Sequence, residues 1–98
     1  YYCPRFIEMM YGKTGPSVGI VSCNTVHSHF NYDIHYSKLK ENFIDMGAFI
    51  VRLPVARNVG FNYNHFSADG RYAEQCAVYC EDHGLITAHI NKALFVHN

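Results

Sequence analysis

The sequence has no excess of charge of either sign. Its 98 residues carry eight lysines and arginines against eight aspartates and glutamates. A protein that grips the phosphates of nucleic acid needs a basic surface, because neutralising phosphates supplies most of the affinity. The balanced composition therefore argues against nucleic acid as a partner.

Long hydrophobic runs are missing as well. No stretch approaches the roughly 18 apolar residues that span a bilayer, and the first residues lack the charged, apolar and small-residue order of a signal peptide. We therefore expect a soluble, cytoplasmic protein without a membrane partner. The length fits one domain with a single core.

The four cysteines lack the spacing of a zinc ribbon or a redox motif. They are Cys3, Cys23, Cys76 and Cys80. The last two fall in a strand-like run, where residues four apart are separated by roughly 13 Å, too far for a disulfide. We expect reduced, buried cysteines, as suits the cytosol.

The seven histidines form no recognisable set of metal ligands. His27 and His29, in "VHSH", are the best pair. No helix carries an HExxH-type spacing, and no pattern marks the remaining ligands that a metal ion would need. The sequence therefore predicts no metal site.

Patterns of strand and helix alternate in the first half of the chain. Residues 17–23, "SVGIVSC", follow the turn signal "GKTGP" and predict a first strand. A helix is expected from Asn31 or Asp33, either of which can cap it, to Gly47, which ends it. Its apolar residues recur at spacings of three and four and would face the core: Tyr32, Tyr36, Leu39, Phe43 and Met46.

The second half continues the alternation. Residues 48–55, "AFIVRLPV", predict a second strand, with Pro54 at an edge or a bulge. Residues 56–70 are rich in Asn, Gly, Ser and Asp and predict a long loop, usually a functional feature in so small a domain. A third strand is expected at 74–80, followed by a short helix that Asp82 caps. The final "ALFVHN" predicts a fourth strand.

The order β-α-β-β-α-β is that of the ferredoxin-like α+β sandwich, expected here over residues 17–98 as a single domain. Residues 1–16 stand outside this unit as an N-terminal extension. In residues 48–53 apolar side chains occupy odd and even positions alike, so both faces of the strand are apolar. A monomer would expose one of these faces, so we expect a homo-oligomer assembled through the open sheet face.

Four short stretches stand out beside these patterns: "VSCN" at 21–24, Tyr63 in the long loop, "GRYAE" at 70–74 and "EQCAVYC" at 74–80. In this combination the chain, over about residues 17–98, resembles the phage-encoded S-adenosylmethionine lyases, formerly described as hydrolases. These enzymes help a phage to escape restriction by destroying the methyl donor in the host cytoplasm. The resemblance implies a homotrimer with active sites between subunits.

The chemistry that the resemblance implies is an intramolecular displacement. The carboxylate of S-adenosylmethionine attacks its own γ carbon, the sulfonium leaves, and methylthioadenosine and homoserine lactone are released without a metal or a cofactor. Glu74 would pair with the substrate ammonium, and Tyr63 would contact the methionine end. Further substrate contacts would come from two aromatic residues and the end of the first strand: Phe61, Phe66, Ser22, Cys23 and Asn24.

Each of these residues also has a plainer interpretation. Glu74 would serve as a solvated carboxylate at a strand entry, Tyr63 would pack in its loop, and the polar residues of "VSCN" suit turns. Two other functions therefore stay open: a non-catalytic phage inhibitor that docks a host enzyme, and a ferredoxin-like module that senses an adenine nucleotide. A phosphate-binding sensor should show a glycine-rich loop or a Lys/Arg cluster, and neither is present.

Overall fold

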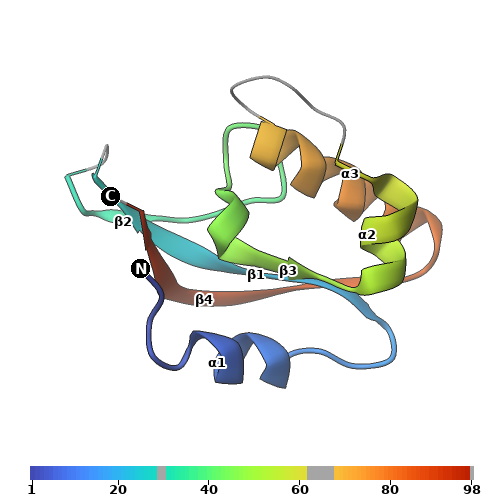
Figure 1. Cartoon of the computed structure of the whole chain (residues 1–98), viewed down its shortest axis with the longest axis horizontal. Helices are drawn as coiled ribbons and strands as arrows, with labels where there is room; N and C mark the ends of the chain where they lie inside the picture. The colour runs from blue at the N-terminus through green and yellow to red at the C-terminus, as the bar shows by residue number, and fades with distance from the viewer. Residues whose placement is uncertain (29–30, 62–67, 98) are drawn as a thin grey trace.

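The computed structural model describes residues 1–28, 31–61 and 68–97. Its elements, in chain order, are α1 (Phe6–Gly12), β1 (Val18–His27), β2 (Ile34–His35), the 3-10 helix η2 (Met46–Ala48), β3 (Phe49–Val51), α2 (Leu53–Val59), α3 (Ala68–Asp82) and β4 (Ile86–His97). Together they form an α+β fold built around one sheet (Figure 1). Among these described residues, no helix is both long and apolar enough to cross a membrane.

β1 is the central strand of the sheet. It pairs in parallel with β4 along its whole length, from Val18 opposite Ile86 to His27 opposite His97. It pairs antiparallel with β3 near its start and with β2 near its end. The sheet is therefore mixed, and two strands far apart in the sequence, β1 and β4, lie side by side.

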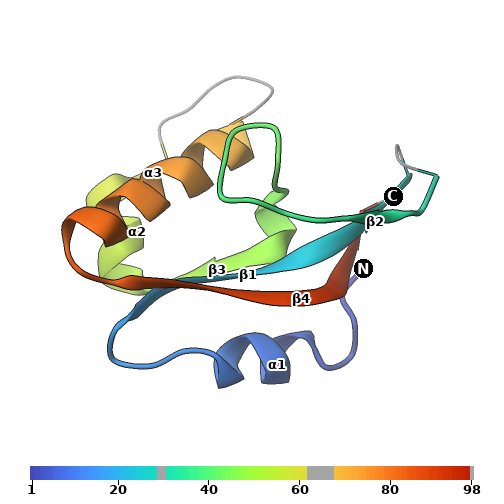
Figure 2. The same cartoon turned by 180° about the vertical axis from the view of Figure 1, so that it is seen from behind.

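Helices cover both faces of this sheet. Figure 2 shows α2 and α3 on one face and α1 on the other. A strand enclosed in this way should read as a nearly continuous apolar run, as the first half of β1 does. The core draws large side chains from every layer: Phe6, Met10, Ile20, Val21, Phe49, Val55, Tyr72, Ile90 and Leu94.

The segment that the sequence set apart as an extension, residues 1–16, packs on the sheet. Backbone hydrogen bonds of 3.0 and 2.8 Å join Tyr1 to Val96 of β4. Phe6 and Met10, both in α1, are buried in the core. The expectation of an open sheet face is therefore wrong where α1 lies, because this helix covers the face within the same chain.

The first predicted strand is confirmed, and β1 extends it to His27. The helix expected from about residue 31 to Gly47 is wrong, since this segment holds β2, an irregular stretch and the start of η2. Asn31, Tyr32 and Asn42 have positive φ angles, which a right-handed helix does not accommodate. Most of the predicted apolar stripe is exposed to solvent: Tyr32, Tyr36, Phe43 and Met46.

The predicted third strand is wrong because residues 74–80 belong to α3. Its buried residues are spaced at the helical period: Tyr72, Ala73, Cys76 and Cys80. The helix expected after Asp82 is wrong too, because β4 begins at Ile86. The described residues of the fourth predicted strand, 93–97, lie within β4. The order α-β-β-β-α-α-β therefore replaces the expected β-α-β-β-α-β.

The predicted second strand is shorter than expected. β3 covers only Phe49–Val51, and α2 begins at Leu53. Pro54 lies in the first turn of α2, where its missing N–H is not needed by the helix. α2 also occupies the first part of the predicted loop at 56–70, whose residues 62–67 lie outside the described residues.

All four cysteines are free, as predicted, and three of them are buried. Cys76 and Cys80 lie one turn apart on α3, not in a strand. Burial disfavours the thiolate and raises the pKa of Cys23 and of Cys76 to about 11. These thiols are therefore protonated at neutral pH.

Candidate functional site

Glu74 lies within α3, not at the entry of a strand. Its side chain is 32% exposed, and Oε2 is 3.5 Å from Nη1 of Arg71, one turn earlier on the same helix. The positive charge that meets Glu74 is therefore an arginine of its own helix. An exposed pair of this spacing is worth only about 0.3 to 0.5 kcal/mol, so a cationic ligand can replace Arg71 at low cost.

Glu74 and Tyr72 point to different sides of α3. The ring centroid of Tyr72 is 6.2 Å from that of Phe49 in β3 and 5.2 Å from that of Phe61. Two positions along an α-helix correspond to a rotation of about 200°. The carboxylate of Glu74 is therefore directed away from β3 and from Phe61.

The side of α3 that carries Glu74 is crowded at one end and open at the other. One turn before Glu74, a Cβ added to Gly70 would lie 2.7 Å from the backbone nitrogen of Asn42, so the segment at 40–42 packs directly on the helix. This contact explains why "GRYAE" begins with glycine. One turn after Glu74, Val78 is 46% exposed. The carboxylate thus lies beside an apolar side chain that no other described element covers fully.

The aromatic residues predicted to contact substrate are placed only in part. Tyr63 and Phe66 lie outside the described residues. Phe61 is half exposed and meets the ring of Tyr72 edge to face. Within one chain, Phe61 and Glu74 are therefore on opposite sides of α3.

The polar residues of "VSCN" form a hydrogen-bonded network with β4. Oγ of Ser22 is 2.8 Å from Nδ1 of His89, and Nε2 of the same ring is 2.9 Å from Oδ1 of Asn24. The backbone N–H of Ser37 donates to that same Oδ1 at 3.2 Å, which identifies it as the oxygen of the amide. Nδ2 of Asn24 in turn donates to Oδ1 of Asn91 at 2.8 Å.

The partners in this network assign the protons of His89. Nε2 donates to the amide oxygen of Asn24, so Nδ1 is free of its proton and accepts from the Ser22 hydroxyl. Desolvation lowers the pKa of His89, which favours the neutral ring that this arrangement needs.

Ser22, His89 and Asn24 follow the order of a nucleophile, a base and an orienting amide, but their burial gives them another role. Ser22 and Asn24 are only 3% and 1% exposed, so the hydroxyl is closed to an external substrate. Cys23, between them, is fully buried. The network fixes the junction of β1 and β4, and contacts of these three residues with a substrate stay a prediction.

A second polar cluster joins the ends of β1 and β4 to the segment before η2. It consists of His27, Asp45 and His97, whose ligand atoms all lie within 4.8 Å of one another. In the sequence His27 pairs best with His29, which lies outside the described residues. Asp45 and His97 carry no spacing signal that could have found them, because they come from separate parts of the chain.

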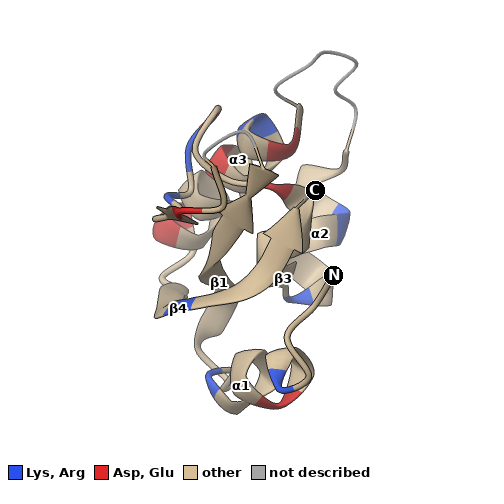
Figure 3. Cartoon of the chain, turned by 90° about the vertical axis from the view of Figure 1, so that its left-hand side faces the viewer, with Lys and Arg blue, Asp and Glu red and all other residues tan. Residues whose placement is uncertain are grey.

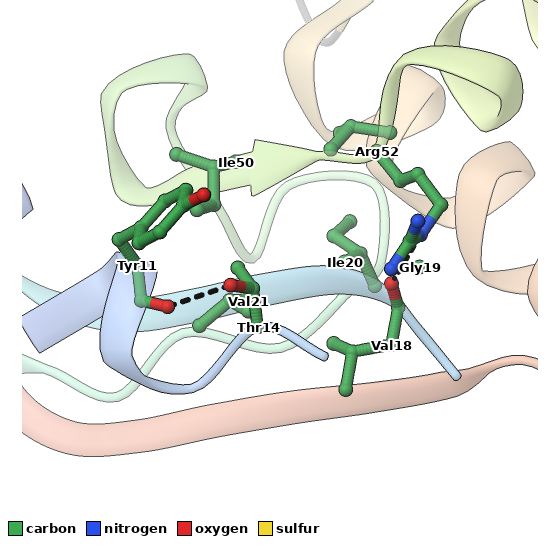
Figure 4. A pocket seen from close by; sticks show the side chains of 9 residues that line it. Tyr11, Thr14, Val18, Gly19, Ile20, Val21, Ile50 and Arg52 are labelled. Atoms are coloured by element: carbon green, nitrogen blue, oxygen red, sulfur yellow. Dashed lines mark hydrogen bonds between the residues drawn. The ribbon is translucent and has the colours of Figure 1, made fainter. Parts of the chain in front are cut away.

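A pocket of about 270 Å³ lies between the end of α1 and strands β1 and β3 (Figure 4). Tyr11 is at one end of the pocket and Arg52 at the other. Arg52 donates from Nε to the carbonyl of Val18 at 2.8 Å and from Nη2 to the carbonyl of Gly15, so its charge holds the loop before β1. The pocket is slightly below the usual range of about 300 to 1,000 Å³ for ligand sites, and Glu74 does not line it.

Charged residues of both signs lie on α3, and α1 carries Glu8 between the flanking Arg5 and Lys13, whereas the strands carry few (Figure 3). In this view, basic and acidic positions of the described residues lie close to each other on α3. Comparison of the chain with protein-family models, with curated proteins and with solved structures finds no match.

Proposed function

We propose that this chain is an S-adenosylmethionine lyase of the phage anti-restriction type, acting in the cytoplasm of a bacterial host. The observation that carries the proposal is the "GRYAE" motif with Tyr63 upstream of it. Among the described residues, Glu74 of this motif is a part-exposed carboxylate held by one weak ion pair. The ferredoxin-like class belongs to the same proposal. A layer of two helices on one face of a four-stranded sheet is compatible with it, although the order of the elements differs.

In this proposal Glu74 binds the substrate and takes no proton. The ammonium of S-adenosylmethionine replaces Arg71 beside the carboxylate, and this contact folds the methionine chain so that its carboxylate approaches the γ carbon. The sulfonium is already a good leaving group, so holding the reacting atoms about 3 to 3.5 Å apart supplies most of the catalysis. The reaction needs no metal and no base.

A site shared between copies of the chain fits the surroundings of Glu74. The exposed side of α3 presents this carboxylate next to Val78, and other large apolar side chains are exposed elsewhere. They include Ile7, Tyr11, Tyr36, Leu53 and Ile86. Exposed apolar surface of this kind favours contacts with other copies, and we propose a trimer in which a neighbouring copy completes the site over Glu74.

The direct test is incubation of the protein with S-adenosylmethionine, followed by chromatography for methylthioadenosine and homoserine lactone. Glu74→Gln keeps the shape of the side chain and removes its charge. A charge-assisted hydrogen bond is worth about 1.5 to 3 kcal/mol, so turnover should fall by about tenfold to a hundredfold or more. Glu81→Gln, on the same helix, is the matched control and should keep its activity. Intact substrate with the wild type would contradict the proposal and favour a non-catalytic binding protein.

Two further measurements separate the parts of the proposal. Internal displacement gives homoserine lactone and keeps every carbon-bound hydrogen of the substrate. Elimination by a base would remove a proton from the β carbon and give an unsaturated amino acid, so mass spectrometry of the product separates the two mechanisms. A solution mass of one 11.2 kDa chain at micromolar concentration would rule out the trimer. If sites are shared, two inactive variants damaged on opposite sides of one interface should restore part of the activity when they are folded together.

A further inference from the structure

Three side chains of metal-ligand type converge where β1 and β4 end. His27 ends β1, His97 ends β4, and Asp45 directly precedes η2. Oδ2 of Asp45 is 3.3 Å from Nδ1 of His97 and 3.9 Å from Nε2 of His27. One ligand atom from each residue lies within 4.8 Å of the other two.

These separations are close to those of a metal centre. Zinc binds imidazole nitrogen and carboxylate oxygen at about 2.0 to 2.2 Å, so neighbouring ligand atoms in a tetrahedral site are roughly 3.4 Å apart. We propose that His27, Asp45 and His97 bind a divalent transition-metal ion, Zn²⁺ being the natural candidate. Two imidazoles and one carboxylate suit this class of ion, whereas Mg²⁺ and Ca²⁺ prefer oxygen ligands throughout.

The backbone and the packing support the two histidines as a pair. They occupy opposed positions in the parallel register of β1 and β4, and their ring centroids are 4.1 Å apart. His27 is 8% exposed and is fixed by its surroundings. His97 is nearly half exposed, so an ion can reach the cluster from solvent.

The cysteines do not compete for the ion. Zinc prefers thiolate where it is available, but burial raises the pKa of Cys23 and Cys76 to about 11 and keeps these thiols protonated. Cys80 is buried as well, and burial raises its pKa in the same direction. Among the described residues, the cluster of His27, Asp45 and His97 is therefore a better metal site than the buried thiols.

A bound ion would join three parts of the fold that are distant in sequence. It would link the ends of β1 and β4 to the segment before β3. Next to Asp45, the backbone N–H of Met46 donates to Oδ2 of Asp69 at 3.3 Å, so the link reaches the first turn of α3. The role of the ion is structural, and the inference does not depend on the proposed lyase activity, which needs no metal.

The test is thermal unfolding of the protein, free of any polyhistidine tag, with and without Zn²⁺ and in the absence of S-adenosylmethionine. Zn²⁺ well above its dissociation constant should raise the melting temperature by at least about 5 °C. His97→Gln and Asp45→Asn should abolish the shift, because each removes a ligand. His83→Gln, an exposed histidine at the end of α3, is the matched control and should keep the shift.

Cobalt provides a second readout that does not depend on the stability of the variants. Co²⁺ bound to the wild type should give visible d–d bands without the intense near-ultraviolet absorption of thiolate ligands. In NMR spectra, Zn²⁺ should move the ring signals of His27 and His97 and leave those of His83 unchanged. The proposal fails if the melting temperature does not respond to Zn²⁺, if the ligand variants respond as the wild type does, or if the His27 and His97 signals stay in place.

Discussion

The two halves of β1 are buried to the same depth by different chemistry. Ile20 and Val21, in the first half, are apolar and nearly fully buried. The second half is polar, and yet it is buried as completely: Ser22, Asn24, Thr25 and His27. Apolar burial is favourable in itself, whereas each buried polar group needs a partner to offset its desolvation.

The polar half of β1 is the better place to look for a functional site. The first half is enclosed between helices, and its apolar side chains need only fit the space between them. The second half depends on side chains from β4 and on the backbone N–H of Ser37 in the segment after β2, so its order depends on contacts between distant residues. A buried polar strand is not the most stable solution for a small domain. This half of β1 holds three of the predicted substrate contacts, Ser22, Cys23 and Asn24, and it ends at His27 of the cluster.

The largest effect is expected in the apolar half. Ile20→Ala should lower the free energy of unfolding by about 2 to 5 kcal/mol, because it leaves a cavity in the core beside β3. Urea unfolding of the variant measures the loss. Ile7→Ala, at an exposed position of α1, should change stability by less than about 0.5 kcal/mol. Equal losses for the two variants would mean that Ile20 is not in the core.

In the polar half, Asn24→Ala should cost about 2 to 3 kcal/mol, because it leaves His89, Asn91 and the N–H of Ser37 without this partner. The loss should be seen in urea unfolding and in faster hydrogen exchange of the Ser37 amide. Asn58→Ala, at an exposed position of α2, is the control. An unchanged Ser37 amide would show that the network does not hold this segment.

A smaller, pH-dependent effect is expected from His89, whose pKa is lowered by desolvation. The unfolded chain binds a proton near pH 6.5, and the folded chain resists it to lower pH. Stability contributed by the neutral ring is therefore present above about pH 6.5 and is lost as the pH falls through this value towards the folded pKa. Unfolding measured between pH 8 and 5 should show a flatter slope in His89→Gln. A slope in His89→Gln equal to that of the wild type would contradict the assignment.

The smallest effect should have the opposite sign. Oγ1 of Thr25 is buried and has no hydrogen-bond partner within the described part of the chain. Thr25→Val replaces this hydroxyl by a methyl group of similar size, so stability should stay constant or rise by up to about 1 kcal/mol. Ser22→Ala, which removes a bonded hydroxyl, should instead lose about 1 kcal/mol. Equal losses for the two would mean that Thr25 has a partner.

Short sequence patterns predict some elements of the fold and miss others. β1 was predicted because its β-branched run is long enough to favour a strand. α3 was missed because "EQCAVYC" also fits an alternating pattern, although Cys76 and Cys80 are spaced for a helix. The apolar spacing at 32–46 favours a helix, but Tyr32 and Asn42 adopt positive φ angles, and the segment holds β2 and an irregular stretch instead.

The candidate sites depend on pairings that local sequence does not encode. The "GRYAE" motif points to Glu74. Its pairing with Arg71 follows only from the helical conformation of the segment, which brings residues three apart onto one side. His89 reaches Ser22 across 67 residues, and His97 reaches Asp45 across 52. Such contacts follow from the pairing of β4 with β1. No short pattern in either strand specifies this pairing.

The pairing of β1 with β4 slows the folding of the chain. The central strand acquires its longest pairing only when a segment some 67 residues away in sequence has docked beside it. This is a high contact order for so small a domain, and the entropy of closing that loop must be overcome before the sheet gains its main hydrogen bonds. We expect folding on the millisecond-to-second scale of β-rich domains, with an edge of β1 exposed until β4 arrives. During that interval, β1 is the segment most prone to pair with another chain.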